Sequence, residues 1–231
     1  MIARIITLSG NKASLESAQR CINSSAGAGN EFDIKIFEAV TAEQVPSIMN
    51  KNMFQWSYPI EGSRDDFATG MRLNSYPTAV IERRIACFLS HYFCWKEAVD
   101  TNEPVLILEH DAIFNYKFDP QEFIDSKWEA VGINDPRGAT RRANNYHDIV
   151  QTFTKNMQQV PSIDEFNIPQ GMAGNSAYVI KPSLANKAIK KFKEIGMWPN
   201  DALLCRQLFP AIAQTKQYYT KVQGIESTTS L

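Results

Sequence analysis

The sequence predicts one α/β domain, an α/β/α sandwich with a mainly parallel central sheet. Strand and helix patterns alternate along the chain, which is typical of helices that cover both faces of a parallel sheet. Residues 105–108 read Val-Leu-Ile-Leu, an uninterrupted apolar run that indicates a strand buried on both faces. The chain has 231 residues, which is enough to bury a sizeable core. We therefore expect a single domain over residues 1–231.

The N-terminal part of the chain is expected to form a strand, a helix and a second strand. The two strands are predicted at residues 2–8 and 34–40. Between them, apolar residues recur on one helical face from about Ser14 to Ser24, and Ser14 is the predicted N-cap. Residues 53–76 mix aromatic, glycine and acidic residues without a period. They predict a long loop of the kind that is usually functional or disordered.

The alternation continues in the rest of the chain. The longest helix is expected over about 78–100, and its two apolar faces predict that most of it is buried. Residues 134–170 show little periodicity and are expected to be an irregular insertion. The remaining predicted elements are strands at 105–109, 128–133 and 176–180 and a helix at about 183–194.

Composition and charge exclude several classes of protein. The hydrophobic fraction of 44% and the charged fraction of 21% are those of a soluble globular protein. A formal net charge of -1 gives no electrostatic reason to expect a nucleic-acid partner. No apolar run approaches the ~18 to 20 residues of a membrane span, and the N-terminal run is too short for a signal peptide. We expect a cytoplasmic protein, with peripheral membrane contact as the alternative.

Two acidic residues follow the central predicted strand. Glu109 and Asp111 are separated by His110, and ligands of open α/β sheets bind at the carboxyl ends of the strands. Two carboxylates at that place suit a hard divalent cation that is also held by substrate phosphates. The alternative is a polar strand end that caps the next turn.

Two motifs carry a resemblance to a known family. Residues 84–91 read Arg-Ile-Ala-Cys-Phe-Leu-Ser-His, and residues 106–112 read Leu-Ile-Leu-Glu-His-Asp-Ala. This pair resembles glycosyltransferase family 25, whose pattern is roughly G-E-x-G-C-x-x-S-H and then L-I-L-E-D-D. The family includes lipopolysaccharide and collagen galactosyltransferases. The likeness covers most of the chain and is strongest between residues 84 and 113.

Later segments resemble the family more weakly. Residues 174–180 are similar to its G-x-x-A-Y-x-I strand, and residues 199–201 are similar to its P-x-D turn. Gln223 and Ser227 resemble its C-terminal Q-x-x-x-S.

The chain departs from the family pattern at two places. Arg83 and Arg84 replace the glycine and glutamate before the cysteine, so a base stands where the family has an acid. His110 replaces the middle acid of the E-D-D triplet, while the outer carboxylates remain. His110 either points away from a cation or supplies a nitrogen ligand that favours softer ions.

The resemblance implies a GT-A-like (Rossmann-like) fold and a transferase. The implied reaction moves a hexose, galactose or glucose, from a UDP-sugar to a hydroxyl of a glycan such as a lipopolysaccharide-type oligosaccharide. Mn²⁺ or Mg²⁺ would be held by Asp111, with Glu109 directly or through water, and would act on the diphosphate as a Lewis acid. Asn175 and Ser176 are the expected acceptor-binding residues. The expected donor-binding residues are Thr7, Leu8, Ser9, Ser90, His91, Glu109, His110 and Asp111.

Two residues have competing interpretations. If the transfer inverts the anomeric centre, a carboxylate must take the acceptor proton, and Asp201 is the candidate; the alternative is an N-cap for residues 202–208. His91 has helical spacing from Cys87 and Cys94, which suggests zinc. A buried, hydrogen-bonded histidine is the favoured interpretation, because no fourth ligand is apparent.

Two other functions stay open. The same carboxylates suit a metal-dependent hydrolase of nucleotide sugars or phosphate esters, although no second carboxylate cluster of the two-metal type is evident. His110 and Arg84 motivate a catalytically inactive, carbohydrate-binding relative as the third possibility.

Overall fold

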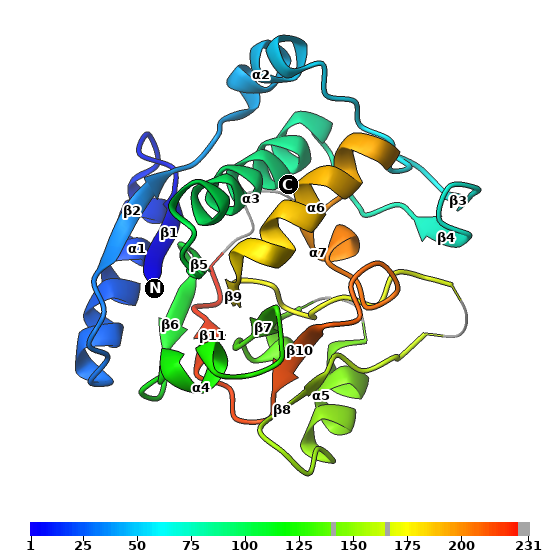
Figure 1. The fold of residues 1–231 in the computed structure, drawn as a ribbon. Helices are drawn as coiled ribbons and strands as arrows, with labels where there is room; N and C mark the ends of the chain where they lie inside the picture. Colours follow the sequence, from blue (N-terminus) through cyan, green and yellow to red (C-terminus); the bar gives the residue numbers. More distant parts are fainter. Residues whose placement is uncertain (140–141, 165–166, 226–231) are drawn as a thin grey trace.

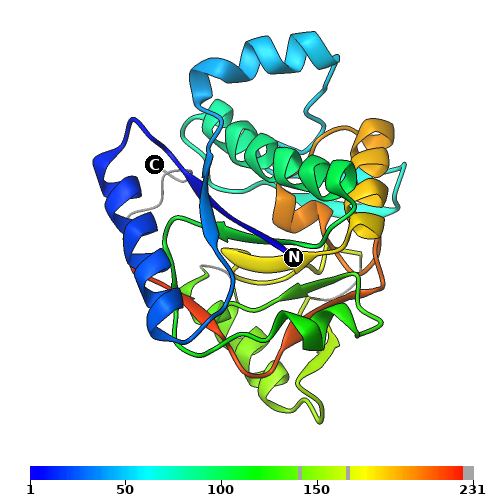
Figure 2. The same cartoon turned by 60° about the vertical axis from the view of Figure 1, so that its left-hand side comes forward.

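A seven-stranded sheet forms the centre of the molecule, with helices on both faces (Figures 1 and 2). The computed structural model describes residues 1–139, 142–164 and 167–225. The strand order is β2-β1-β5-β9-β7-β10-β8. In that order the strands are Ile34–Glu38, Ile2–Thr7, Val105–Glu109, Ala177–Ile180, Ala130–Gly132, Ile212–Thr215 and Met157–Gln159.

The sheet is mixed, but five of its seven strands run in one direction. β1 pairs in parallel with β2 and β5, and β7 pairs in parallel with β10. β9 lies antiparallel between β5 and β7, and β8 is antiparallel to β10 at the edge. The predicted α/β sandwich is therefore confirmed, while the antiparallel insertion of β9 was not anticipated.

The middle strand β5 separates two hydrophobic cores. Its first four residues are fully buried, and successive side chains of a strand point to opposite faces. Ile107 therefore packs into one core and Leu106 into the other. This explains why the strand has no polar residue before Glu109.

Each face of the sheet has its own cover. α3 (Ile81–Thr101) and α6 (Pro182–Ile195) pack together over one face, with α2 (Val45–Asn52) beyond them (Figure 1). α1 (Lys12–Gly27) and α4 (Pro120–Ile124) cover the other face (Figure 2). Smaller elements complete the chain: η1 (Ala42–Gln44), β3 (Ser63–Asp66), β4 (Met71–Asn74), β6 (Ala112–Phe114), η2 (Pro136–Gly138), α5 (Ala143–Gln151), α7 (Asn200–Leu203) and β11 (Thr220–Val222).

Several predicted boundaries were wrong. α1 begins at Lys12 and its N-cap is Asn11, whose side chain accepts from the backbone N–H of Ser14 at 3.0 Å. Ser14 lies inside the first turn and is not the cap. α3 begins at Ile81 rather than near residue 78, because Val80 is still extended.

The two segments expected to be irregular contain regular structure. Residues 53–76 include the β3–β4 hairpin, and residues 134–170 include η2, α5 and β8. Both were missed because short strands and short helices leave little periodicity in a sequence.

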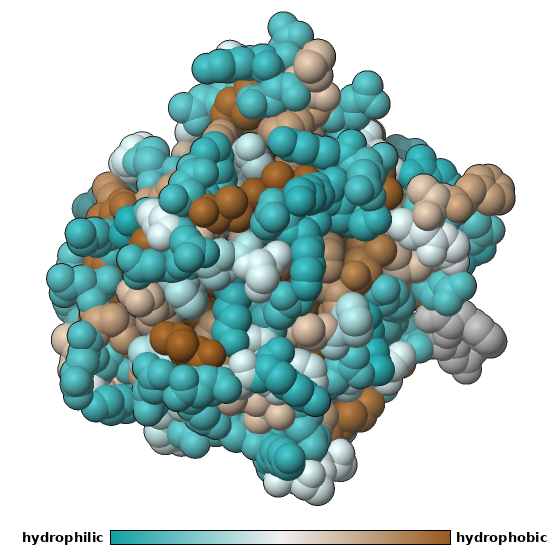
Figure 3. All heavy atoms as spheres, viewed as in Figure 1, coloured by the Kyte–Doolittle hydropathy of each residue, from teal (hydrophilic) through white to brown (hydrophobic). Residues whose placement is uncertain are grey.

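The outer surface is mostly hydrophilic. On the side seen in Figure 3, hydrophobic residues lie in small separate patches among polar ones, as is normal for a folded domain. No helix in the described ranges is long and apolar enough to cross a membrane.

Candidate active site at the carboxyl edge of the sheet

Three strands end together at one edge of the sheet and carry polar residues there. The parallel register places Thr7 beside Glu38 and Ile6 beside Glu109. The carboxyl ends of β1, β2 and β5 therefore meet at the place where open α/β sheets bind their ligands.

Glu109 is held by two hydrogen bonds. His91 Nε2 lies 3.3 Å from its Oε1, and the Ser176 hydroxyl donates to its Oε2 at 3.1 Å. Burial raises the pKa of Glu109, but the hydrogen bonds from His91 and Ser176 act against burial and hold the pKa below its ordinary value. Of the acid pair, Glu109 is thus the member whose charged form the protein favours.

Asp111 has the opposite character. Burial, and then the charge of Glu109, raise the pKa of Asp111 to about 7. Its Oδ1 is buried and has no hydrogen-bond partner among the described residues. An unpartnered carboxylate oxygen beside a second carboxylate is a fit for a divalent cation with oxygen ligands, because the cation would satisfy the oxygen and offset the repulsion.

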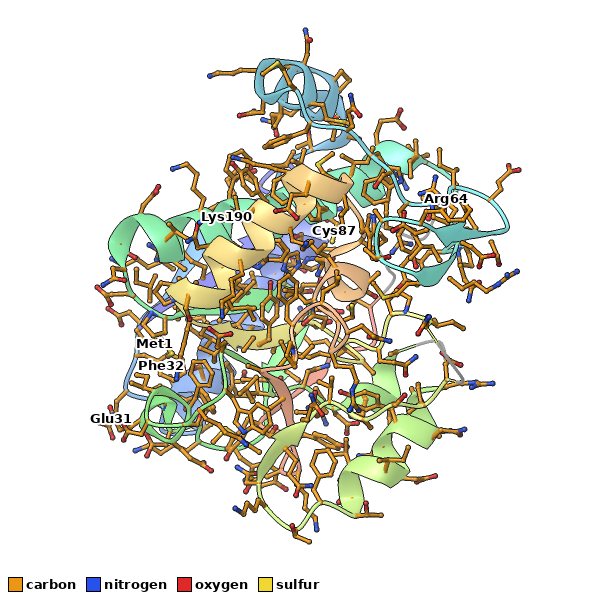
Figure 4. The ribbon with its side chains drawn as sticks, turned by 45° about the vertical axis from the view of Figure 1, so that its right-hand side comes forward. Met1, Glu31, Phe32, Arg64, Cys87 and Lys190 are labelled. Atoms are coloured by element: carbon orange, nitrogen blue, oxygen red, sulfur yellow. The ribbon has the colours of Figure 1, made fainter. Side chains whose placement is uncertain are left out.

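His91 is buried and hydrogen-bonded, as the favoured interpretation predicted. It is 1% exposed, and its Nδ1 lies 2.9 Å from the hydroxyl of Tyr178. The helix spacing had suggested Cys94 as a zinc partner, but Glu109 takes that place. The ligand atoms of Cys87, His91 and Glu109 all lie within 4.8 Å of one another, and Cys87, which is labelled in Figure 4, is half-buried.

His110 lies at the rim of the acid pair. Burial lowers the pKa of its imidazole, although Glu109 acts in the other direction, so the neutral form of the ring is favoured. Its ring does not belong to the cluster of three described metal-binding side chains.

Asp201 lies in the wall of a pocket of about 160 Å³. It stands in the first turn of α7, whose N-cap is Pro199, so the alternative N-cap role is wrong. The same wall contains Tyr58, Tyr76 and Tyr146. The pocket is thus built from both segments expected to be irregular together with the candidate base.

Arg84 acts on Asp201 through its charge. Burial raises the pKa of Asp201, and the Arg84 guanidinium lowers it. Arg84 donates to the Thr78 hydroxyl and to the Pro77 carbonyl, both at 3.2 Å, and its Cζ lies 5.3 Å from the centre of the Tyr76 ring. The sequence marked Arg84 only as a departure from a motif. Its position one helical turn before Cys87 was the signal that it faces the site.

The predicted donor residues on β1 differ in what they offer. Thr7 is fully buried, and its hydroxyl donates to the Ile5 carbonyl at 3.1 Å, so its side chain is occupied. Ser9 is exposed, and its hydroxyl donates to Glu38 Oε1 at 2.7 Å. Leu8 lies between them, half-buried. Glu38, which was not predicted from the sequence, adds a third carboxylate to this edge of the sheet.

Ser90 is occupied inside the protein. Its hydroxyl donates to the Ala86 carbonyl at 2.8 Å and accepts from the Val40 backbone N–H at 2.9 Å. It therefore ties the chain after β2 to α3. Any effect of Ser90 on a donor is through this segment.

Asn175 and Ser176 lie next to the acid pair. The Ser176 hydroxyl lowers the pKa of both Glu109 and Asp111, against the larger effect of burial. Both polar atoms of the Asn175 side chain are buried without a hydrogen-bond partner among the described residues. An unpaired amide at this place is a candidate ligand contact.

Gln223 anchors the C-terminal segment beneath the acid pair. Its backbone N–H donates to the Asp111 carbonyl at 2.8 Å, and its side chain donates to the carbonyls of Ala112 and Ser17 at 3.0 and 2.9 Å. Ser227, its partner in the motif, lies outside the described residues.

Comparison with known proteins identifies the family. Residues 11–204 match the family model described as Glycosyltransferase family 25 (LPS biosynthesis protein). The chain therefore belongs to glycosyltransferase family 25. The resemblance seen in the motifs is confirmed, and the sheet with helices on both faces is of the expected α/β class.

A similar protein from Homo sapiens is Procollagen galactosyltransferase 2, with 32% identity over 89 residues. The match covers 38% of this chain and 13% of the human protein, so the chain spans only a small part of that relative.

Two solved structures show distant likeness. Mouse Xyloside xylosyltransferase 1 has a TM-score of 0.43 and 7% identity, over 91% of this chain and 83% of that one. The WbbM bifunctional glycosyltransferase has a TM-score of 0.44 and 11% identity, over 91% of this chain and 38% of that one. Likeness this distant says nothing about which sugar is transferred.

Proposed function

We propose that this protein transfers a hexose, galactose or glucose, from a UDP-sugar to a hydroxyl of a glycan acceptor with the help of Mn²⁺ or Mg²⁺. A lipopolysaccharide-type oligosaccharide is the acceptor class that the family suggests. The observation that carries the proposal is the buried Oδ1 of Asp111, which lies near Glu109 and has no hydrogen-bond partner in the described part of the chain.

The acid pair is the proposed cation site. Asp111 would bind the ion directly, and Glu109 would bind it directly or through water. A bound cation would neutralise the diphosphate leaving group as a Lewis acid. The exposed Ser9 and Glu38, which are hydrogen-bonded to each other, offer donors and acceptors for the nucleotide beside the end of β1.

The pocket beside Asp201 is the proposed acceptor site. Its volume of about 160 Å³ is of the size of one sugar ring, and Tyr58, Tyr76 and Tyr146 line it. In an inverting transfer, the Asp201 carboxylate would take the proton of the attacking hydroxyl. Arg84 favours the ionised form of Asp201 that this step needs.

The test is thermal stability with UDP, with and without Mn²⁺. A ligand that binds only the folded state stabilises it by mass action, by about 2.7 kcal/mol at a hundred times its Kd. We expect UDP to raise the melting temperature of the wild type in the presence of Mn²⁺ and to lose this effect in Asp111→Asn. Asp65→Asn is the matched control, because Asp65 lies on the exposed β3–β4 hairpin. The absence of any shift in the wild type would contradict the proposed donor site.

Turnover distinguishes the alternatives. A transferase consumes the UDP-sugar faster when a glycan acceptor is present. A hydrolase consumes it at the same rate with or without the acceptor. A carbohydrate-binding relative would bind the glycan and release no UDP.

A further inference from the structure

Four polar side chains form a continuous line from the buried side of α3 to the acid pair. The indole N–H of Trp95 donates to the Tyr178 hydroxyl at 2.7 Å, and that hydroxyl lies 2.9 Å from His91 Nδ1. His91 Nε2 lies 3.3 Å from Glu109 Oε1. Trp95 and Tyr178 are fully buried, and His91 is 1% exposed, so water does not compete for these groups.

The direction of every hydrogen bond in this line follows from its first member. An indole nitrogen only donates, so the Tyr178 oxygen accepts from Trp95. The single hydroxyl proton of Tyr178 then goes to the other group in contact, which is His91 Nδ1. A neutral imidazole with an accepting Nδ1 carries its proton on Nε2. His91 therefore donates to Glu109.

We propose that Trp95, Tyr178 and His91 form a one-directional hydrogen-bond chain that holds the Glu109 carboxylate in one orientation for the cation that it and Asp111 would bind. Ser176 donates to the second oxygen of Glu109, so both of its oxygens are oriented by the protein. The three residues of the chain are positioning residues. Their role in cation binding rests on the proposed function, whereas the direction of the hydrogen bonds does not.

The hydrogen-bond chain also bears on whether Cys87, His91 and Glu109 bind zinc. Zinc bonds of ~2.0 to 2.2 Å in a tetrahedral site place nitrogen and oxygen ligands roughly 3.3 Å apart, close to the distance between His91 and Glu109. Distance alone therefore admits zinc. Binding through Nε2, however, moves the histidine proton to Nδ1, and the Tyr178 hydroxyl then receives two donors and has no acceptor for its own proton. The chain thus disfavours a zinc site here.

The first experiment is ¹⁵N NMR of histidine-labelled protein, which needs neither donor nor turnover. The three histidines are assigned with His91→Gln and with His147→Gln. We expect the His91 signals of a neutral ring protonated on Nε2. A proton on Nδ1 would overturn the proposal.

The second experiment measures Mn²⁺ affinity by calorimetry in the presence of UDP. Loss of a residue that orients a metal ligand weakens affinity ~10- to 100-fold, and we expect a loss in this range for His91→Leu and for Tyr178→Phe. His91→Gln retains a donor near the Nε2 position and should recover most of the affinity. Melting temperatures verify that each variant is folded.

The matched control is a second histidine–tyrosine pair. His147 Nδ1 lies 3.0 Å from the Tyr218 hydroxyl, and Tyr218 packs in a hydrophobic cluster separate from the two that contain β5. His147→Leu and Tyr218→Phe should leave Mn²⁺ affinity unchanged. Equal losses in both pairs, or no rescue by His91→Gln, would show that the effect is only structural and would overturn the proposal.

Co²⁺ absorption tests the competing zinc site. Thiolate ligation of Co²⁺ produces a sulfur-to-metal charge-transfer band, which we expect to be absent. A band that disappears in Cys87→Ser but persists in Cys94→Ser would overturn the proposal. A wild type that shows the expected histidine signals but no UDP-dependent Mn²⁺ binding would instead contradict the proposed function and leave the hydrogen-bond chain standing.

Discussion

Glu109 and Asp111 are two residues apart, yet their environments separate their pKa values. Glu109 receives hydrogen bonds from His91 and Ser176, whereas Asp111 Oδ1 receives none from the described residues. Burial raises the pKa of Asp111, and the charge of the nearby Glu109 raises it further, because two close carboxylates resist simultaneous ionisation. The pair therefore consists of Glu109, whose charged form is favoured, and Asp111, whose pKa is raised to about 7.

Cation affinity should depend on pH because of Asp111. Its pKa is raised to about 7, so a proton competes with the cation below that pH. We expect the Kd for Mn²⁺ to rise up to ~10-fold per pH unit below 7 and to level off above it. Calorimetry across this range measures the effect. A Kd that is constant across pH 7 would contradict the assignment of Asp111 as the ligand.

Arg84 should set the pH range in which Asp201 acts as a base. Burial raises the pKa of Asp201 and Arg84 lowers it, so Arg84→Met should raise the pKa further. Asp201 can accept a proton only when its carboxyl group is ionised, which requires a pH above its pKa. The acid limb of the kcat/KM profile should therefore move to higher pH. Arg84→Lys keeps the charge and should shift it less. If the acid limb of Arg84→Met stays where it is in the wild type, the charge of Arg84 does not set the pKa of Asp201.

At the scale of elements, short pieces of irregular chain position the site residues. α7 has only four residues, and the segment before β9 packs against it. An isolated bridge joins Gly171 to Cys205, and the backbone N–H of Arg206 donates to the Gln170 carbonyl at 2.9 Å. These contacts hold Asp201 at the pocket wall.

Gly171 should be essential for this packing. A Cβ added to it would lie 2.1 Å from the Asp201 carbonyl oxygen, so the backbone of α7 would have to move. We expect Gly171→Ala to lower the free energy of unfolding by ~1 to 3 kcal/mol and to reduce turnover more than UDP binding. Urea unfolding and donor titration measure the two effects.

Gly27→Ala is the control for Gly171→Ala. Gly27 ends α1, and a Cβ there meets no atom within 4 Å. This substitution should be neutral or stabilising, by up to ~1 kcal/mol. A Gly171→Ala protein as stable and active as Gly27→Ala would refute the packing argument.

At the scale of the whole molecule, one sheet joins two cores. β5 contributes Leu106 to the core under α1 and Ile107 to the core under α3 and α6. Because both cores share the same strands, neither face can lose its packing without disturbing the other. The site at the strand ends depends on both.

We expect residues 1–231 to unfold in one cooperative transition, as the prediction of a single domain requires. Leu106→Ala and Ile107→Ala each remove a fully buried side chain and should cost ~2 to 5 kcal/mol. Calorimetry should show that each variant lowers the temperature of the same transition. Two transitions that respond separately to the two variants would mean two independent folding units.

Local patterns explain which parts of the site were predictable. The run at 105–108 indicated a buried central strand, and the acid-x-acid triplet after it was correctly placed at the carboxyl edge. The burial of His91 was also predicted. Ser90 and Thr7 were expected at the donor site, but their hydroxyls are occupied within the protein, because hydrogen bonds to distant backbone leave no trace in the pattern of a sequence.

The sequence by itself determined the α/β class, the family and the position of the acid pair, because periodicity and motifs are properties of neighbouring residues. Tertiary structure alone decided that β9 runs antiparallel beside β5, which brings Tyr178 to His91 across 87 positions and Ser176 to Glu109 across 67. It also decided that Asp201 shares a pocket with Tyr58 and the segment before β9. Hydrogen-bond direction, burial and pKa depend on which distant segments meet, and only the folded chain specifies that.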